Sequence, residues 1–225
     1  MKTRKFTIAL ILILSVTFSF AQYQEQERTS FGILGGVNMQ TFNGKDNSGN
    51  KLENEMVVGY HVGVNILIPV APEFFFQPGL LFTTKGAKNT SGLITSNYSI
   101  SSIELPLNLV YRGSLGNGYV LVGFGPYVSY ALMGKAKHEG GSVSYESDIE
   151  FKNEIESGDP LTTSYFKAFD AGGNVFVGYE MAGGLFIQLN TQLGMLNIKP
   201  EDKRIPNDES VIKNTGFGLS LGYRF

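Results

Sequence analysis

Large apolar residues and small polar residues alternate with a period of two over most of the chain. Phe217, Leu219, Leu221, Tyr223 and Phe225 share one face of residues 216–225, and glycine, serine and arginine occupy the other face. This alternation predicts a β-strand with one apolar face. The same pattern recurs in residues 31–41, 58–68, 74–85, 102–111, 120–130, 168–179 and 185–194. The sequence therefore predicts an all-β protein of about eight strands, the smallest usual size for a transmembrane barrel.

The polar face of these strands indicates which side looks outward. It consists mostly of Gly, Ser, Asn and Gln, with isolated charges. A soluble barrel would turn its large apolar residues inward and cover its outer face with Lys, Glu and Thr. Small polar residues suit a narrow lumen, and an apolar outer face suits lipid. Since an open sheet edge in hydrocarbon is costly, we expect an eight-stranded antiparallel up-and-down transmembrane β-barrel.

The connections between the strands alternate in length. Residues 69–73, 112–118 and 180–183 form short turns, whereas residues 43–56, 87–97, 133–164 and 199–213 form long polar loops. Outer-membrane barrels have short periplasmic turns and long external loops. Both chain ends are then expected on the periplasmic side. An interfacial belt of aromatic residues is expected near the short turns, made of Phe31, Phe74, Phe76, Tyr111, Tyr179, Tyr223 and Phe225.

The N-terminus has the pattern of a secretory signal peptide. Lys2, Arg4 and Lys5 precede an apolar and hydroxyl-bearing run over residues 6–20. That run is shorter than the ~20 residues of a spanning helix, which favours a cleaved signal over a retained anchor. We expect cleavage between Ala21 and Gln22. The predicted division is a signal peptide at 1–21, a short segment at 22–29 and an outer-membrane barrel at 30–225.

Composition excludes several classes of protein. Removal of residues 1–21 takes three of the 18 basic residues and none of the 20 acidic ones, so the mature chain has a net charge of −5. The sequence has no stripe of clustered Lys and Arg of the kind that nucleic-acid binding requires. The absence of Cys excludes a lipid-modified cysteine, disulfides and cysteine metal sites. We expect no cofactor.

Six segments together resemble the PorT-like outer-membrane β-barrel proteins. They are FFFQPGLLFTTKG at 74–86, SSIELPLNLVYR at 101–112, YVLVGFGPYVSYAL at 119–132, FDAGGNVFVGYEM at 169–181, GGLFIQLNTQLGMLNI at 183–198 and GFGLSLGYRF at 216–225. The resemblance implies a C-terminal signal for the barrel assembly machinery. Leu219, Leu221, Tyr223 and Phe225 match that signal. Many relatives carry an Arg in the middle of the seventh strand, where this chain has residues 190–192, Asn-Thr-Gln.

Three charged residues fall on the predicted lumen face: Lys85, Glu104 and Asp170. Buried charges are costly unless they are paired, so we expect these residues to form a polar network that packs the interior. A ligand or proton site and solvated, unpaired side chains are the alternatives. The two histidines, His61 and His138, leave a lipid hydrolase open, although the spacing selects no partner serine.

Two predicted loops contain clustered polar residues. Asp46, Ser48, Asn50 and Glu53 faintly resemble a calcium loop, but such residues also gather in turns for backbone reasons. Loop 133–164 is acidic, and its alternating apolar residues near 143–151 suggest strands that project beyond the membrane. An exposed strand edge there could recruit a partner protein by strand addition, or the loop could be a passive acidic canopy.

Taken together, the sequence predicts a monomeric, non-enzymatic outer-membrane barrel whose partners are outer-membrane lipid and the barrel assembly machinery. If loop 133–164 is a partner surface rather than a canopy, an unknown protein bound there is a further partner. The predicted role is surface binding, adhesion or an envelope- or secretion-associated structural function. A narrow channel and a membrane-embedded lipid hydrolase are the alternatives. An eight-stranded barrel has barely enough interior for its own side chains, which disfavours a diffusion pore.

Overall fold

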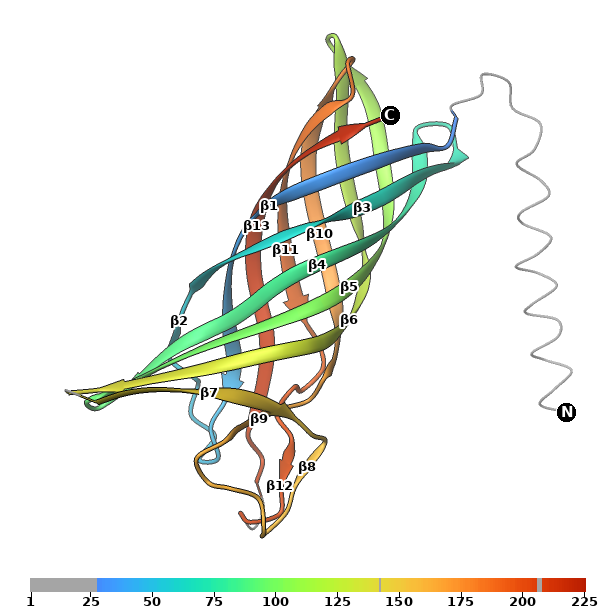
Figure 1. Ribbon diagram of the computed structural model, residues 1–225. Coiled ribbons are helices and arrows are strands. Elements are labelled where there is room, and N and C mark those ends of the chain that lie inside the picture. The colour runs from blue at the N-terminus through green and yellow to red at the C-terminus, as the bar shows by residue number, and fades with distance from the viewer. Residues whose placement is uncertain (1–27, 142, 206–207) are drawn as a thin grey trace, which may run out of the picture.

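The computed structural model describes residues 28–141, 143–205 and 208–225. The expected signal peptide and its cleavage site lie outside these residues. Antiparallel pairing joins each long strand to the next, and the last pairs with the first to close a barrel (Figure 1). In order around the wall the strands are β1 (Ser30–Lys45), β3 (Val57–Ala71), β4 (Phe74–Ser91), β5 (Ile94–Leu115), β6 (Gly118–Gly140), β10 (Phe169–Met181), β11 (Leu185–Gly194) and β13 (Val211–Arg224). No helix in this part of the chain is long and apolar enough to cross a membrane.

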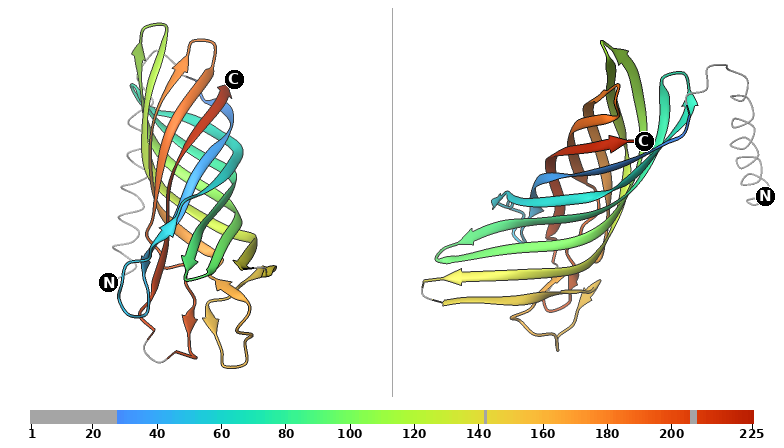
Figure 2. Two further views of the ribbon diagram at one scale, coloured as in Figure 1. Left: turned by 90° about the vertical axis from the view of Figure 1, so that its left-hand side faces the viewer. Right: turned by 45° about the horizontal axis from the view of Figure 1, so that its top comes forward.

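Short turns gather at one end of the barrel, which we call the turn end, and the longer connections gather at the other, the loop end (Figures 1 and 2). Tight turns follow β3, β5 and β10, and they contain Glu73, Gly116 and Gly184 at positive φ. Both ends of the closed wall lie at the turn end, where the Phe225 N–H donates to the Phe31 carbonyl at 2.8 Å. The expected alternation of short and long connections is therefore confirmed for these three turns.

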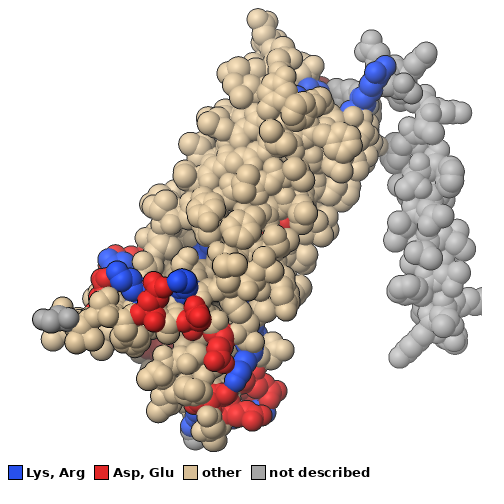
Figure 3. Space-filling view, in the orientation of Figure 1, with Lys and Arg blue, Asp and Glu red and all other residues tan. Residues whose placement is uncertain are grey.

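The two faces of the strands point as the alternation predicts. The apolar face points outward, and Val58, Leu189 and Phe124 are 74%, 60% and 56% exposed. Charged residues on the face drawn in Figure 3 gather at the loop end, and the wall carries little charge. An uncharged wall of exposed apolar residues is the surface that lipid requires.

Aromatic residues border the apolar wall at both ends. At the turn end the rings of Phe74 and Tyr111 lie 5.5 Å apart between centroids, as the expected belt requires. Toward the loop end, the rings of Tyr60 and Phe82 lie 6.2 Å apart. This second belt is not among the sequence-based expectations. Phe169 and Tyr179 bound the outward face of β10, and this span agrees with the ~9–11 residues of a transmembrane strand.

Many of the large inward side chains fit the wall because they face a glycine on a neighbouring strand. His61 is paired with Gly36, and Phe176 is paired with Gly123. A Cβ added to Gly123 would lie 2.2 Å from a ring carbon of Phe176. Further pairs of this kind are Asn38–Gly59, Asn65–Gly32, Gln40–Gly216, Gln188–Gly178, Asn190–Gly218 and Phe186–Gly222. The high glycine content thus provides space for amide and aromatic side chains in a narrow lumen.

The expected long loop at 87–97 is wrong. β4 and β5 remain paired up to Ser91 and Ile94, and only a tight turn with Gly92 at positive φ joins them. Loop 133–164 also begins as a hairpin, in which the end of β6 pairs with β7 (Val143–Phe151), as its apolar alternation suggested. Residues 86–91, 94–99, 134–140 and 143–148 form a sheet that extends beyond the barrel, here called the projecting sheet (Figure 1).

Short strands organise the rest of the loop end. β2 (Asn54–Glu55) pairs with β4, and β9 (Ser164–Phe166) pairs in parallel with β7. β8 (Glu154–Ile155) and β12 (Glu201–Asp202) form a separate parallel pair. The β8–β12 pair thereby joins the connection between β7 and β9 to the connection between β11 and β13.

Apolar residues interrupt the mostly polar interior near both ends of the barrel. A turn-end cluster of buried apolar residues consists of Leu67, Phe75, Val110, Leu121 and Phe176. A loop-end cluster consists of Phe42, Ala87, Ile100, Ala131, Ala136, Ile149, Phe166 and Ile198. Both clusters lie near the ends of the barrel, close to water, where the burial of apolar surface is favourable.

Candidate functional site: the barrel interior and the loop end

The interior is layered along the barrel axis. From the turn end to the loop end, the inward residues of β4 pass from Phe75 in the turn-end cluster through Gln77 and Thr83 to Lys85, and then to Ala87 in the loop-end cluster. Polar residues therefore lie between two apolar clusters.

Lys85, Glu104 and Asp170 lie together and form what we call the central charged layer. The Lys85 Nζ is 2.6 Å from Glu104 Oε2 and 3.8 Å from Asp170 Oδ2. It also lies 4.3 Å from the centroid of the Tyr127 ring, within cation–π distance. The structure thus brings together the three lumen charges that the sequence singles out.

Neutral donors complete this layer. Gln192 Nε2 donates to Glu104 Oε1 at 2.5 Å. Asp170 Oδ2 accepts hydrogen bonds from the Tyr127 hydroxyl at 3.2 Å and from Asn214 Nδ2 at 2.8 Å. The amide of Gln192 in β11 therefore contacts Glu104, and Lys85 supplies the opposite charge.

A second charged layer, at the turn end, is absent from the sequence-based expectations. Glu180 Oε1 accepts from Arg112 Nε at 3.2 Å and from Arg112 Nη2 at 2.8 Å, while Glu180 Oε2 accepts from Arg224 Nε at 2.7 Å. The Arg112 guanidinium carbon lies 3.3 Å from the centroid of the Tyr119 ring. Arg112 and Glu180 fall at strand ends that the sequence analysis assigned to turns. Arg224 lies on the strand face that the alternation predicts to point inward, and this position was the signal that could have revealed the second layer.

An amide-lined chamber of about 70 Å³ lies between the two charged layers. Five amide atoms of its lining are buried without a protein partner: Asn38 Oδ1, Gln40 Oε1, Gln77 Nε2, Asn174 Oδ1 and Gln188 Nε2. A polar cavity of this size accommodates a few water molecules, which would satisfy such atoms. It is well below the ~300–1,000 Å³ of sites for drug-sized ligands.

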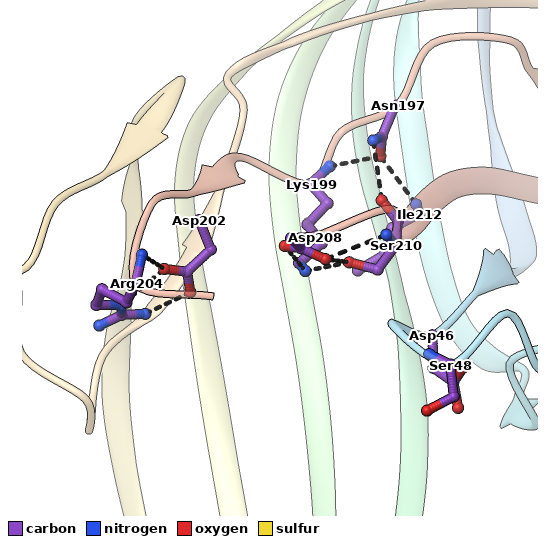
Figure 4. A network of polar contacts seen from close by, with 9 residues as sticks. All are labelled: Asp46, Ser48, Asn197, Lys199, Asp202, Arg204, Asp208, Ser210 and Ile212. Carbon is purple, nitrogen blue, oxygen red and sulfur yellow. Dashed lines mark hydrogen bonds and ion pairs between the residues drawn. The ribbon is translucent and has the colours of Figure 1, made fainter. Parts of the chain in front are cut away.

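The loop end is held by its own polar contacts. Asn197 Oδ1 accepts from the backbone N–H groups of Lys199 and Ile212, and Lys199 Nζ pairs with Asp208 (Figure 4). Arg204 forms a two-pronged pair with Asp202 at 2.8 Å for each contact. The hydrogen bond from Arg204 lowers the pKa of the Asp202 carboxyl below its usual value.

The calcium-like residues of the first loop form a turn. Asp46 Oδ1 accepts the backbone N–H groups of Ser48 and Asn50 at 2.9 and 2.8 Å. These contacts favour the turn interpretation of the cluster, because one carboxylate oxygen is engaged by backbone N–H groups. In the described part of the chain, no group of three or more His, Cys, Asp or Glu side chains is arranged to hold a metal ion.

The projecting sheet ends in a free strand edge. Residues 143–148 of β7 pair with β6 on one side, and no described strand pairs with their other side. The outer face of this sheet carries Lys135 paired with Glu146 at 2.5 Å and Lys137 paired with Glu139 at 2.6 Å. The same face of β6 is apolar where the strand belongs to the barrel wall. Because charged side chains are costly in hydrocarbon, this part of the sheet lies outside the membrane.

The profile of the outer membrane protein beta-barrel domain family matches residues 20–199. The chain belongs to this family. It is therefore an outer-membrane β-barrel protein, in agreement with its closed wall and its apolar outer face. No curated protein sequence matches it.

Several solved outer-membrane barrels are similar in structure. Ail, the attachment invasion locus protein of Yersinia pestis, is 13% identical with a TM-score of 0.40, and the match covers 88% of this chain and 99% of Ail. An outer membrane channel of Pseudomonas putida F1 is 9% identical with a TM-score of 0.29, and the match covers 91% of this chain and 97% of the channel. Similarities this low give no information about the function of this chain.

Each histidine contacts a serine in this barrel. His61 Nε2 and Ser220 Oγ lie 2.8 Å apart, and Asn190 Nδ2 donates to the same Oγ at 3.2 Å. Ser220 is only 1% exposed and lines the amide chamber, which is too small for a lipid. His138 Nδ1 lies 2.8 Å from Ser96 Oγ on the projecting sheet. The buried pair gives an ester substrate no access, so its geometry does not favour a lipid hydrolase.

Proposed function

We propose that this outer-membrane protein is a non-enzymatic, eight-stranded, closed barrel that binds a partner protein through the free edge of β7. In the proposed orientation the turn end faces the periplasm and the projecting sheet lies outside the cell, as is usual for such barrels. The resemblance of its strands to PorT-like proteins supports a role at the cell envelope without naming a pathway.

The observation that carries this proposal is the unpaired edge of residues 143–148. An open strand edge offers N–H and C=O groups in the spacing that an extended segment requires. The paired strands of the projecting sheet hold this edge away from the barrel (Figure 2). An edge supported by a sheet is already ordered, so binding costs less conformational entropy than it would for a loop.

Charge indicates the kind of partner. β7 carries Glu146, Asp148 and Glu150, whereas it has no basic residue. Two copies joined edge to edge through β7 would bring carboxylates close together, which is unfavourable. Glu146 and Glu150 pair with Lys135 and Lys152, so the complementary partner is an extended segment that brings basic rather than acidic side chains beside Asp148.

Crosslinking in intact cells tests the partner surface. A photoreactive amino acid at Val143, which is 68% exposed in β7, should give an adduct with a protein, whereas the same group at Ala182 in a turn at the other end should not. Proline cannot donate a ladder hydrogen bond, so Ser144→Pro and Tyr145→Pro each remove one N–H group from β7. Since successive N–H groups point to opposite edges, one variant should abolish the adduct while leaving the hairpin paired. An adduct retained in both variants would contradict strand addition.

Conductance separates this proposal from a channel. The two charged layers and the small amide chamber predict no discrete current steps for the purified barrel in planar bilayers. A channel would instead show steps whose size changes in Glu104→Gln. The observation of such steps would refute the closed interior.

A further inference from the structure

A basin of about 440 Å³ opens at the turn end of the barrel, opposite the proposed partner surface. Leu67 and Phe75 of the turn-end cluster line its apolar part. Arg112, Arg224 and Glu180 line its charged part, and Arg28 stands at its edge. The basin is therefore a recess with an apolar floor and several guanidinium groups.

Among the described residues that line this basin, positive side chains outnumber negative ones. Arg112 and Arg224 both pair with the carboxylate of Glu180, which is 2% exposed. Arg224 is itself 7% exposed, and its Nη1 donates to Asn65 Oδ1 at 3.2 Å. Its Nη2 is buried and has no hydrogen-bond partner among the described residues. An unpaired donor on a buried cation is unfavourable, and an anionic acceptor would remove this cost.

The edge of the basin reaches the membrane surface. Tyr223 and Phe225 line it, and their rings belong to the outward face of β13, with Phe225 72% exposed. Aromatic rings at this level of a barrel lie among lipid headgroups. A headgroup beside β13 therefore has a short path into the basin, past Gly184 in the turn before β11.

From these contacts we propose that the basin binds a phosphate group, presented by a phospholipid headgroup of the adjoining leaflet or by free phosphate. A guanidinium matches phosphate oxygens through paired N–H donors, and such bonds are stronger than neutral ones. The aromatic edge favours the lipid as the source. Arg28 attracts the phosphate at the entrance, and Arg224 Nη2 donates to it inside.

The test uses the folded barrel in detergent and three probes: dihexanoyl phosphatidylglycerol, inorganic phosphate and dihexanoyl glycerol, which lacks phosphate. Binding is followed by native mass spectrometry and by the ³¹P signal of the two phosphate probes. Arg224→Lys retains a charge for Glu180 but removes the free Nη2, and we expect about tenfold weaker phosphate binding. Arg28→Gln should weaken binding about threefold, as for one exposed charge. Lys45→Gln, at the other end of β1, is the matched control and should bind as the unaltered protein does.

The difference in gel mobility between unheated and heated samples verifies that each variant is folded before binding is compared. Binding of the phosphatidylglycerol probe that falls in both arginine variants, with no binding of the phosphate-free lipid, supports the proposal with a lipid source. Equal binding of inorganic phosphate that is lost in Arg224→Lys supports the phosphate site but assigns it to free phosphate. Binding that is unchanged in folded Arg224→Lys and Arg28→Gln would overturn the proposal.

Discussion

Replacement of Gly123 by alanine tests the packing rule of the lumen directly. The added Cβ would lie 2.2 and 2.3 Å from two ring carbons of Phe176, far inside the ~3.5–4.0 Å of a carbon contact. The ring has little room to move, because it packs against Leu67, Phe75 and Val110 in the turn-end cluster. Overpacking of this kind costs about 1–3 kcal/mol. We expect Gly123→Ala to lower the free energy of unfolding by this amount.

Urea unfolding of the purified barrel in lipid vesicles provides the measurement, with tyrosine fluorescence and gel mobility as two probes of the same transition. Gly173→Ala in β10 is the matched control. Its Cβ would meet only Met195 Cε at 3.6 Å, an ordinary contact, and the backbone oxygen of Gly125 at 4.0 Å. The control should unfold at nearly the urea concentration of the unaltered protein.

A second substitution distinguishes steric overlap from a general effect of alanine. Phe176→Leu removes the ring that the new Cβ meets, so the double variant should lose less stability than the two single losses added together. Coupling of about 1–2 kcal/mol is expected for residues in contact. If Gly123→Ala is as stable as Gly173→Ala, or if the two losses simply add, the complementarity between glycine and large side chains does not hold the wall together.

Three further predictions concern the charges and the C-terminus. Glu104→Gln leaves Lys85 without its close carboxylate, and it should lower the free energy of unfolding by about 3–5 kcal/mol; an unchanged thermal midpoint in detergent would exclude a structural role for the pair. Arg204→Gln should raise the pKa of the Asp202 carboxyl, measured by ¹³C NMR, because the hydrogen bond that lowers this pKa is lost. Because the pKa of Asp202 is lowered in the folded protein, the ionised carboxylate stabilises the loop at pH values above the ordinary Asp pKa of ~3.9. This stabilisation is lost as the pH falls through the lowered pKa. Phe225→Ala should reduce the amount of folded barrel in cells more than it reduces the stability of refolded protein, and equal effects would argue against an assembly signal.

The sequence predicted the wall well because two faces of a strand differ whenever one of them contacts lipid. Inward and outward positions in β3, β10 and β13 follow directly from the period of two. The part of the projecting sheet that β4 and β5 form was missed for the same reason. Apart from Leu93 and Ile94 beside the turn, residues 86–97 are polar or small on both faces, so no alternation marks them as strands once they leave the membrane.

Contacts in the lumen depend on register, which alternation alone does not give. Asp170 and Glu104 come together because both are paired with Ser129 of β6, one from each side. Lys85 is paired with Ile100 rather than with Glu104, so only its long side chain brings the charge to this layer. The sequence could therefore select these three residues as inward-facing, but it could not determine their distances.

The two charged layers explain why a polar interior still favours a closed barrel. Among the described residues, the central layer has one lysine and two carboxylates, and the turn-end layer has two guanidiniums and one carboxylate. For the proposed closed barrel, we expect a cation to be repelled at the turn-end layer and an anion to be repelled at the central layer. Each interaction acts in a narrow, weakly solvated space, where charge effects are stronger than in water. An ion of either sign therefore meets a layer of its own sign before it crosses, in addition to the apolar clusters at both ends.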